Sequence, residues 1–217
     1  MKIGLIGLAG AGKDTSAVIL QRVLAEQGLK FEIDRYAAPL KNAAKEVFGA
    51  NFDERNVKEV DVFVDQDTMI EASFRCLRQL GFTDDEDEKA SELFFEHIGF
   101  LEYLSPRLYQ QLLGTEVVRA VRPSAWVDRI RRLNRNIIIP DARFENEVSD
   151  CNLLITRFQN IDKPKHPSEH LAWDLQFTGK VLPVDTININ NEQGTTLELL
   201  EERIRSVVSL INFNEVV

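Results

Sequence analysis

Cysteine is scarce in this sequence, and so are the patterns that cysteine forms. Only two cysteines, Cys76 and Cys151, occur among 217 residues. No CxxC pair and no Cys/His cluster has the spacing of a zinc site, which argues against a structural zinc protein. Two cysteines are enough for one disulfide, but nothing in their placement requires it. We expect buried free thiols in a reducing compartment.

The sequence also lacks an excess of basic charge and any long apolar run. Lysine and arginine number 26 against 35 aspartates and glutamates, which gives a net charge of −9. No stretch is dominated by basic residues, so we expect no nucleic acid polymer as a partner. No run approaches the ~20 apolar residues of a membrane span, and residues 1–6 do not resemble a signal peptide. We therefore expect no membrane partner and a cytoplasmic location.

What is present is an alternation of short apolar runs with amphipathic segments. This pattern predicts an α/β fold, a five-stranded parallel sheet with helices on both faces. Its first strand–helix–strand segment predicts a parallel pair of strands. Strands are expected at 2–6, 30–34, 136–139, 153–157 and 186–189, and helices at 13–27, 39–48, 106–121, 126–133 and from Thr195, with Thr195 and Glu198 in capping-box spacing.

Residues 50–104 differ from the rest of the chain. They have a helical pattern, are rich in aspartate and glutamate, and contain no convincing strand. The acidic run 84–88 fits a solvated first helical turn, where the helix dipole favours negative charge; an acidic metal site is the minor alternative. We predict a single domain, 1–217, with a helical insertion at about 50–104.

The strongest motif follows the first strand and opens the first helix, the context of a P-loop. It reads Gly7-Leu8-Ala9-Gly10-Ala11-Gly12-Lys13-Asp14-Thr15. Glycines allow backbone N–H groups to surround phosphate oxygens closely, and the helix amino terminus adds partial positive charge. Lys13 is expected to reach the β and γ phosphates. The predicted nucleotide-binding residues are Gly10, Ala11, Gly12, Lys13, Asp14 and Thr15.

Asp14 departs from the usual motif, which has serine or threonine after the lysine. A carboxylate beside phosphates is repelled unless a cation lies between them. Asp14 therefore either helps to hold Mg²⁺, directly or through water, or turns away to cap local backbone. Thr15 is an alternative source of a phosphate hydrogen bond.

A second group of candidates follows the strand that ends at Ile139. Asp141 stands where a Walker B aspartate is expected, near the carboxyl end of a buried strand, although a turn-forming Pro-Asp pair is an alternative. Arg143 is suited to clamp phosphate oxygens. Glu147 lies one helical turn beyond Arg143, close enough to orient its guanidinium.

Further candidates lie on the predicted helices between residues 106 and 133. Arg107, Gln111 and Gly114 would share one helical face, which is either a ligand-binding face or a solvated one. Leu104, Leu108, Leu112 and Val121 would form the apolar stripe. Trp126 either stacks on a base or fills the core. Arg119 and Arg122 are later candidates.

The loop at 166–170 holds two histidines four residues apart. His166 and His170 have no evident third ligand, and Pro167 lies between them. We favour a loop that contacts the nucleotide over a metal site.

Several of these segments, in this order, resemble the phage-type deoxynucleoside monophosphate kinases, within the nucleoside monophosphate kinase fold. The matching segments are Gly12-Lys13-Asp14-Thr15, Tyr36 to Lys41, Ser105-Pro106-Arg107 through Glu116 with Trp126-Val127, Asp141 to Glu147, His166 with Ser168 and Glu169, and Asp185 to Asn190 followed by Thr196-Leu197-Glu198.

The resemblance implies a P-loop NTPase fold and an enzyme that transfers phosphate from ATP·Mg²⁺ to a deoxynucleoside monophosphate. Its catalytic residues would be Lys13, Arg143 and Asp141, and its metal residue Asp14. The expected substrate-binding residues are Lys41, Arg107, Gln111, Trp126, Asp141, Arg143 and Glu147. The location would be the host cytoplasm if the chain is phage-encoded.

Other functions share the phosphate loop. A kinase of another phosphorylated metabolite, such as phosphomevalonate or dephospho-coenzyme A, needs no base-stacking aromatic residue. A nucleotide-dependent switch would retain or hydrolyse nucleotide without an acceptor. For the kinase, part of residues 50–104 is expected to form a mobile cover over the acceptor; a contact in a homodimer is the alternative for this segment.

Overall fold

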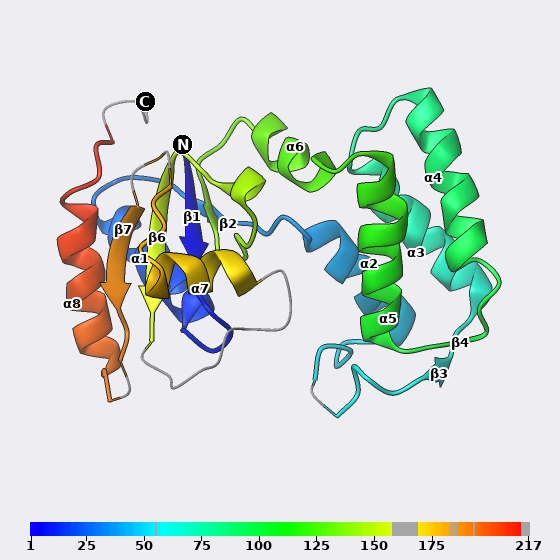
Figure 1. Ribbon diagram of the computed structural model, residues 1–217, viewed down its shortest axis with the longest axis horizontal. Helices are drawn as coiled ribbons and strands as arrows, with labels where there is room; N and C mark the ends of the chain where they lie inside the picture. The colour runs from blue at the N-terminus through cyan, green and yellow to red at the C-terminus, as the bar shows by residue number, and fades with distance from the viewer. Residues whose placement is uncertain (55, 158–168, 183, 185, 193, 214–217) are drawn as a thin grey trace. The chain divides into compact units, whose positions relative to one another are not determined.

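The computed structural model describes residues 1–54, 56–157, 169–182, 184, 186–192 and 194–213, and it divides into two compact units (Figure 1). The first unit combines residues 1–35 with the chain after residue 133, and the second comprises residues 36–133. The predicted helical insertion, 50–104, lies within the second unit, which begins earlier and ends later.

The first unit is built on a five-stranded parallel sheet, as predicted. The strand order is β2-β5-β1-β6-β7, and every neighbouring pair is parallel. The first two strands were predicted to pair. They run parallel, but they are not adjacent, because β5 lies between β1 and β2. The strands are β1 Lys2–Ile6, β2 Glu32–Ile33, β5 Ile137–Ile139, β6 Cys151–Thr156 and β7 Thr186–Asn190.

Helices flank this sheet. Figure 1 shows α7 (His170–Phe177) in front of the strands and α1 (Lys13–Glu26) behind them. α1 packs against α8 (Leu197–Val208), and their apolar faces form one core with β1, β5 and β6. Helix α7 was not predicted. The amino-terminal cap of α8 is Thr196, which accepts a hydrogen bond from the Leu199 N–H, so the predicted cap at Thr195 is wrong by one residue.

The second unit is mainly helical, but it also contains a small sheet. β3 (Val62–Phe63) pairs antiparallel with β4 (Tyr103–Leu104), so the expectation of no strand in 50–104 is wrong. The acidic run does open a helix, whose cap residue Thr83 forms a capping box with Glu86. The helices of this unit are α2 Ala38–Phe48, α3 Gln66–Arg78, α4 Asp84–His97, α5 Pro106–Gln111, η1 Leu112–Arg119 and α6 Ala125–Arg132.

The predicted helix at 106–121 changes its winding halfway. After α5 the chain continues as a π-helix, η1, whose hydrogen bonds span five residues rather than four. Its buried side is formed by Tyr109, Leu113 and Val117, whereas Leu108 is exposed. Of the predicted stripe, Leu104 is buried but belongs to β4, and Leu108 is exposed, so the stripe is not the buried face of this helix.

Cys76 and Cys151 are both buried free thiols, as predicted. Burial raises the pKa of the Cys76 thiol to about 12. None of the helices in the described ranges is long and apolar enough to cross a membrane.

Candidate functional site

The loop that follows β1 lies at the carboxyl edge of the sheet, where α/β proteins bind ligands. From β1 the chain moves toward β2, and from β6 it moves toward β7 on the opposite side. Adjacent strands whose connections leave in opposite directions create a crevice between them. The glycine loop, residues 7–15, therefore begins at this switch point.

The backbone of the glycine loop requires glycine at several positions. Gly10 and Gly12 have positive φ angles of 75° and 95°, which side chains disfavour. At Gly7 a Cβ atom would lie 2.6 Å from the Ile155 carbonyl oxygen on β6. The loop is thus folded tightly against the neighbouring strand, and its last turn starts α1 with N–H groups that have no intrahelical partner.

Lys13 folds back over this loop. Its Nζ donates hydrogen bonds to the carbonyl oxygens of Gly7 at 2.7 Å and Leu8 at 3.0 Å. The pKa of Lys13 lies below its ordinary value, first because the ammonium is buried and second because the Arg143 guanidinium is near. Asp14, Glu169 and Asp141 oppose that decrease. The fold therefore brings the predicted catalytic residues Lys13, Arg143 and Asp141 into one electrostatic environment.

The Asp14 side chain is 77% exposed and forms an ion pair with Arg35. Sequence analysis considered a metal ligand or a backbone cap. The hydrogen bond shown for the Asp14 carboxylate comes from the Arg35 side chain and not from local backbone, so the structure does not show the capping alternative, and a role in holding metal stays a prediction. Arg35 is a residue that sequence analysis missed. The feature of the sequence that could have indicated Arg35 is its position just after β2, at the same edge of the sheet as the glycine loop.

The loop after β5 is held in shape by Glu147. This carboxyl group is only 3% exposed, and its Oε2 accepts hydrogen bonds from the backbone N–H groups of Arg143 at 2.7 Å and Phe144 at 3.2 Å. Glu147 lies in the short 3₁₀ helix η2 (Glu145–Glu147). These hydrogen bonds orient the backbone that carries Arg143; the expected orientation of its guanidinium by Glu147 stays a prediction. The Arg143 residue itself is exposed.

A hollow of about 200 Å³ opens beside the glycine loop. Its lining includes Gly12 and Thr15 of the loop and the start of α1, Arg157 and Asn191 after two strands, and residues 192, 194–197 and 200. Arg157 and Asn191 were also missed as candidates. Both immediately follow parallel strands, β6 and β7, and that position is the only signal the sequence offered.

Three predicted substrate-binding residues of the second unit are polar and accessible. Lys41 pairs with Asp53 at 3.0 Å, and Arg107 pairs with Glu59 at 2.7 Å. Gln111 is exposed at the end of α5. Their participation in one site with the glycine loop stays a prediction.

Trp126 lies in the packed interior of the second unit. It is 3% exposed, and its indole N–H donates to the Gly114 carbonyl oxygen at 3.4 Å. Gly114 is itself buried, and a Cβ there would lie 3.0 Å from a methyl group of Leu40. The predicted common face of Arg107, Gln111 and Gly114 therefore fails at Gly114, because the π-helix shifts the register. Packing is a role of Trp126 that the structure shows; base contact stays a prediction.

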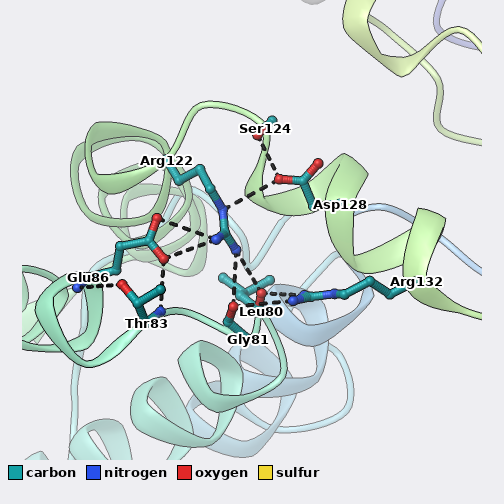
Figure 2. A network of polar contacts seen from close by, with 8 residues as sticks. All are labelled: Leu80, Gly81, Thr83, Glu86, Arg122, Ser124, Asp128 and Arg132. Atoms are coloured by element: carbon teal, nitrogen blue, oxygen red, sulfur yellow. Dashed lines mark hydrogen bonds and ion pairs between the residues drawn. The ribbon is translucent and has the colours of Figure 1, made fainter.

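Arg122, another candidate, belongs to a network within the second unit that Figure 2 shows. Its guanidinium donates to Glu86 at 3.0 Å and to the Leu80 carbonyl oxygen at 2.9 Å, and it lies 3.5 Å from Asp128. Arg132 donates to the same carbonyl oxygen. These contacts join the α3–α4 connection to α6, so Arg122 has a structural role.

Of the expected loop at 166–170, the structure describes Glu169 and His170. His166, Pro167 and Ser168 lie outside the described residues, as does Asp185, and their predicted roles stay predictions. Glu169 lies close enough to Lys13 to influence its pKa.

The residues at the loop suit Mg²⁺ carried by nucleotide phosphates. Such an ion takes only one or two protein carboxylates, with phosphate oxygens and water completing its octahedron. Asp14 and Asp141 both act on Lys13 and are carboxylates at this place. Within the described ranges, no group of three or more histidine, cysteine, aspartate or glutamate side chains is arranged to hold a metal.

Searches against models of known protein families and against curated proteins gave no match to this chain.

Proposed function

We propose that this protein is a P-loop kinase of the nucleoside monophosphate kinase type, which transfers the γ-phosphate of ATP to a deoxynucleoside monophosphate. One observation supports the proposal most directly: Lys13 lies on a glycine loop that opens a helix, donates to two carbonyl groups of that loop, and has its pKa lowered by burial and by the nearby Arg143 guanidinium. Two cations held together cost free energy unless an anion binds between them. A chain of phosphates is such an anion.

The donor would lie along the loop. Its phosphates would accept hydrogen bonds from loop N–H groups and from Lys13, and its nucleoside would occupy the hollow between Arg157 and Asn191. Bound Mg²⁺ would neutralise phosphate charge, with Asp14 and Asp141 as its protein carboxylates. Arg143 would stabilise charge that develops on the transferred group.

The acceptor would use the polar residues of the second unit. Arg107 and Lys41 are cations suited to its phosphate, and each is paired with an exposed carboxylate that a phosphate can displace at little cost. Residues 50–104 would contribute a cover that excludes water, because water competes with the acceptor for the γ-phosphate. Nucleotide positioning and charge stabilisation are sufficient for this chemistry.

The test is a screen of ribo- and deoxyribonucleoside monophosphates, with release of ADP as the readout. We expect ADP release to depend on a deoxynucleoside monophosphate and to be absent in Lys13→Met. Release that depends on phosphomevalonate or dephospho-coenzyme A would identify the rival kinases. ADP release without any acceptor would indicate a nucleotide switch.

A further inference from the structure

Asn191 connects the last strand of the sheet to the glycine loop. It follows β7 directly, and its backbone N–H donates to the Thr156 carbonyl oxygen at 2.7 Å. Its side-chain Nδ2 donates to the Ala11 carbonyl oxygen at 2.8 Å. Because β6 lies between β7 and β1, the Asn191 side chain reaches past the end of β6 to the loop that follows β1.

The loop is shaped to accept this contact. A Cβ atom at Gly12 would lie 2.5 Å from Nδ2 of Asn191, so only glycine allows the approach. The preceding carbonyl oxygen, that of Gly10, accepts a hydrogen bond from Arg157 at 3.1 Å. Two successive carbonyl groups of the loop are thus each held by a side chain from a different strand end.

Holding a carbonyl group also fixes the direction of an N–H group. In a trans peptide, the C=O of one residue and the N–H of the next point in opposite directions. Asn191 therefore sets the direction of the Gly12 N–H, which has no hydrogen-bond partner among the described residues. An unpaired N–H held in one direction is ready to donate to an anion.

We infer that Asn191 is a positioning residue for the phosphate-binding loop: it holds the Ala11 carbonyl outward so that the Gly12 N–H points to the phosphates. The inference rests on the proposed function, which supplies the phosphates. Asn191 also lines the hollow, so direct contact with the nucleoside is the alternative. Inorganic tripolyphosphate has phosphates but no nucleoside, so its binding depends on the first role and not on the second.

The test compares Asn191→Leu with wild type, because leucine has nearly the same shape but no donor. Asn191→Ala is a second variant, and Asn190→Ala is the matched control, since the Asn190 side chain donates to exposed Glu192. Calorimetry measures the affinity for ATP and for inorganic tripolyphosphate, each with Mg²⁺. Thermal melting establishes that each variant is folded.

We expect both Asn191 variants to bind ATP and tripolyphosphate about fivefold to tenfold more weakly, the loss typical of one hydrogen bond. The KM for ATP should rise and the KM for the acceptor should stay unchanged. Wild-type affinity for tripolyphosphate in both folded variants would overturn the inference and leave the proposed function intact. A loss for ATP alone would assign Asn191 to the nucleoside, which also overturns it. If wild type binds neither ligand, the proposed function fails and this inference fails with it.

Discussion

Lys13 is a partly buried cation with a second cation, Arg143, nearby, and both features lower its pKa. A pKa below the ordinary value of 10.5 means that the folded state binds its proton less tightly than the unfolded state does. Between the lowered pKa and 10.5, the unfolded state then holds more protons, so stability rises with pH in that interval. At neutral pH the charge on Lys13 therefore opposes folding.

The first prediction concerns the removal of the charge on Lys13. Lys13→Met should lower turnover by at least ~10²-fold, because the phosphates lose a charged donor. The free energy of unfolding should stay equal or increase, since a buried charge has been removed. Kinetics and denaturant titrations at pH 7 and pH 10 measure the two effects, and the variant should gain less stability between these pH values than wild type. Near-normal turnover would contradict the phosphate-loop assignment.

Arg143 and Arg107 are both predicted to act on the acceptor side, Arg143 mainly in catalysis and Arg107 mainly in binding. Unit charges ~4 Å apart repel by about 4 kcal/mol at an effective dielectric of ~20, so the meeting phosphates need nearby cations. Arg143→Ala should lose at least ~10²-fold in kcat/KM. Arg143→Lys should restore little of that loss, because lysine lacks the planar fork.

Arg107→Ala should instead raise the KM for the monophosphate and leave that for ATP nearly unchanged. The measurement varies each substrate in turn for all three variants. Wild-type efficiency in Arg143→Ala would mean that the loop after β5 is only a turn and that the acceptor site lies elsewhere.

At the scale of an element, the loop after β5 depends on one buried carboxylate. Glu147 accepts hydrogen bonds from two successive N–H groups, including that of Arg143. Glu147→Ala should therefore lower kcat with little change in the KM for ATP, and it should destabilise the protein by about 1–3 kcal/mol because two partly buried N–H groups lose their acceptor.

Glu145→Ala is the matched control for Glu147→Ala. Glu145 lies in the same 3₁₀ helix, but its carboxylate is exposed and pairs with Lys180. Steady-state kinetics and thermal melting of both variants measure the difference. Equal effects of the two substitutions would show that Glu147 does not position Arg143.

Elements set by local patterns were predicted well from the sequence. The glycine loop, β1 and α1 follow from adjacent residues, and the start of α4 follows from its acidic first turn. The helix at 106–121 was predicted less well. Its apolar stripe was assigned with a period of 3.6 residues, and the π-helix η1 breaks that period after Gln111. A local change of winding has no clear sequence signature.

At the scale of the whole molecule, the order of the strands in the sheet was not predicted from the sequence. The insertion of β5 between β1 and β2 brings together segments more than 100 residues apart. The contacts of Arg157 and Asn191 with the glycine loop depend on the same order, since β6 and β7 must lie on one side of β1. Such residues can be recognised only after the sheet is assembled.

The predicted cover, residues 50–104, belongs to the second unit. Asp53 and Glu59, near the start of 50–104, pair with Lys41 and Arg107, the cations predicted to bind the acceptor. Amide hydrogen exchange in 50–104 should slow when ATP and a monophosphate are both bound, and ATP alone should have little effect. Exchange measured by mass spectrometry tests this. Unchanged exchange with both substrates would favour an oligomer contact for this segment.

The central claim is that phosphate passes from ATP to a second nucleotide, and phosphorus NMR of the reaction mixture tests it most directly. With ATP, Mg²⁺ and a deoxynucleoside monophosphate, we predict equal amounts of ADP and the deoxynucleoside diphosphate, and no matching rise in inorganic phosphate. Lys13→Met should give neither product. Inorganic phosphate in step with ADP, and no new diphosphate, would contradict the account.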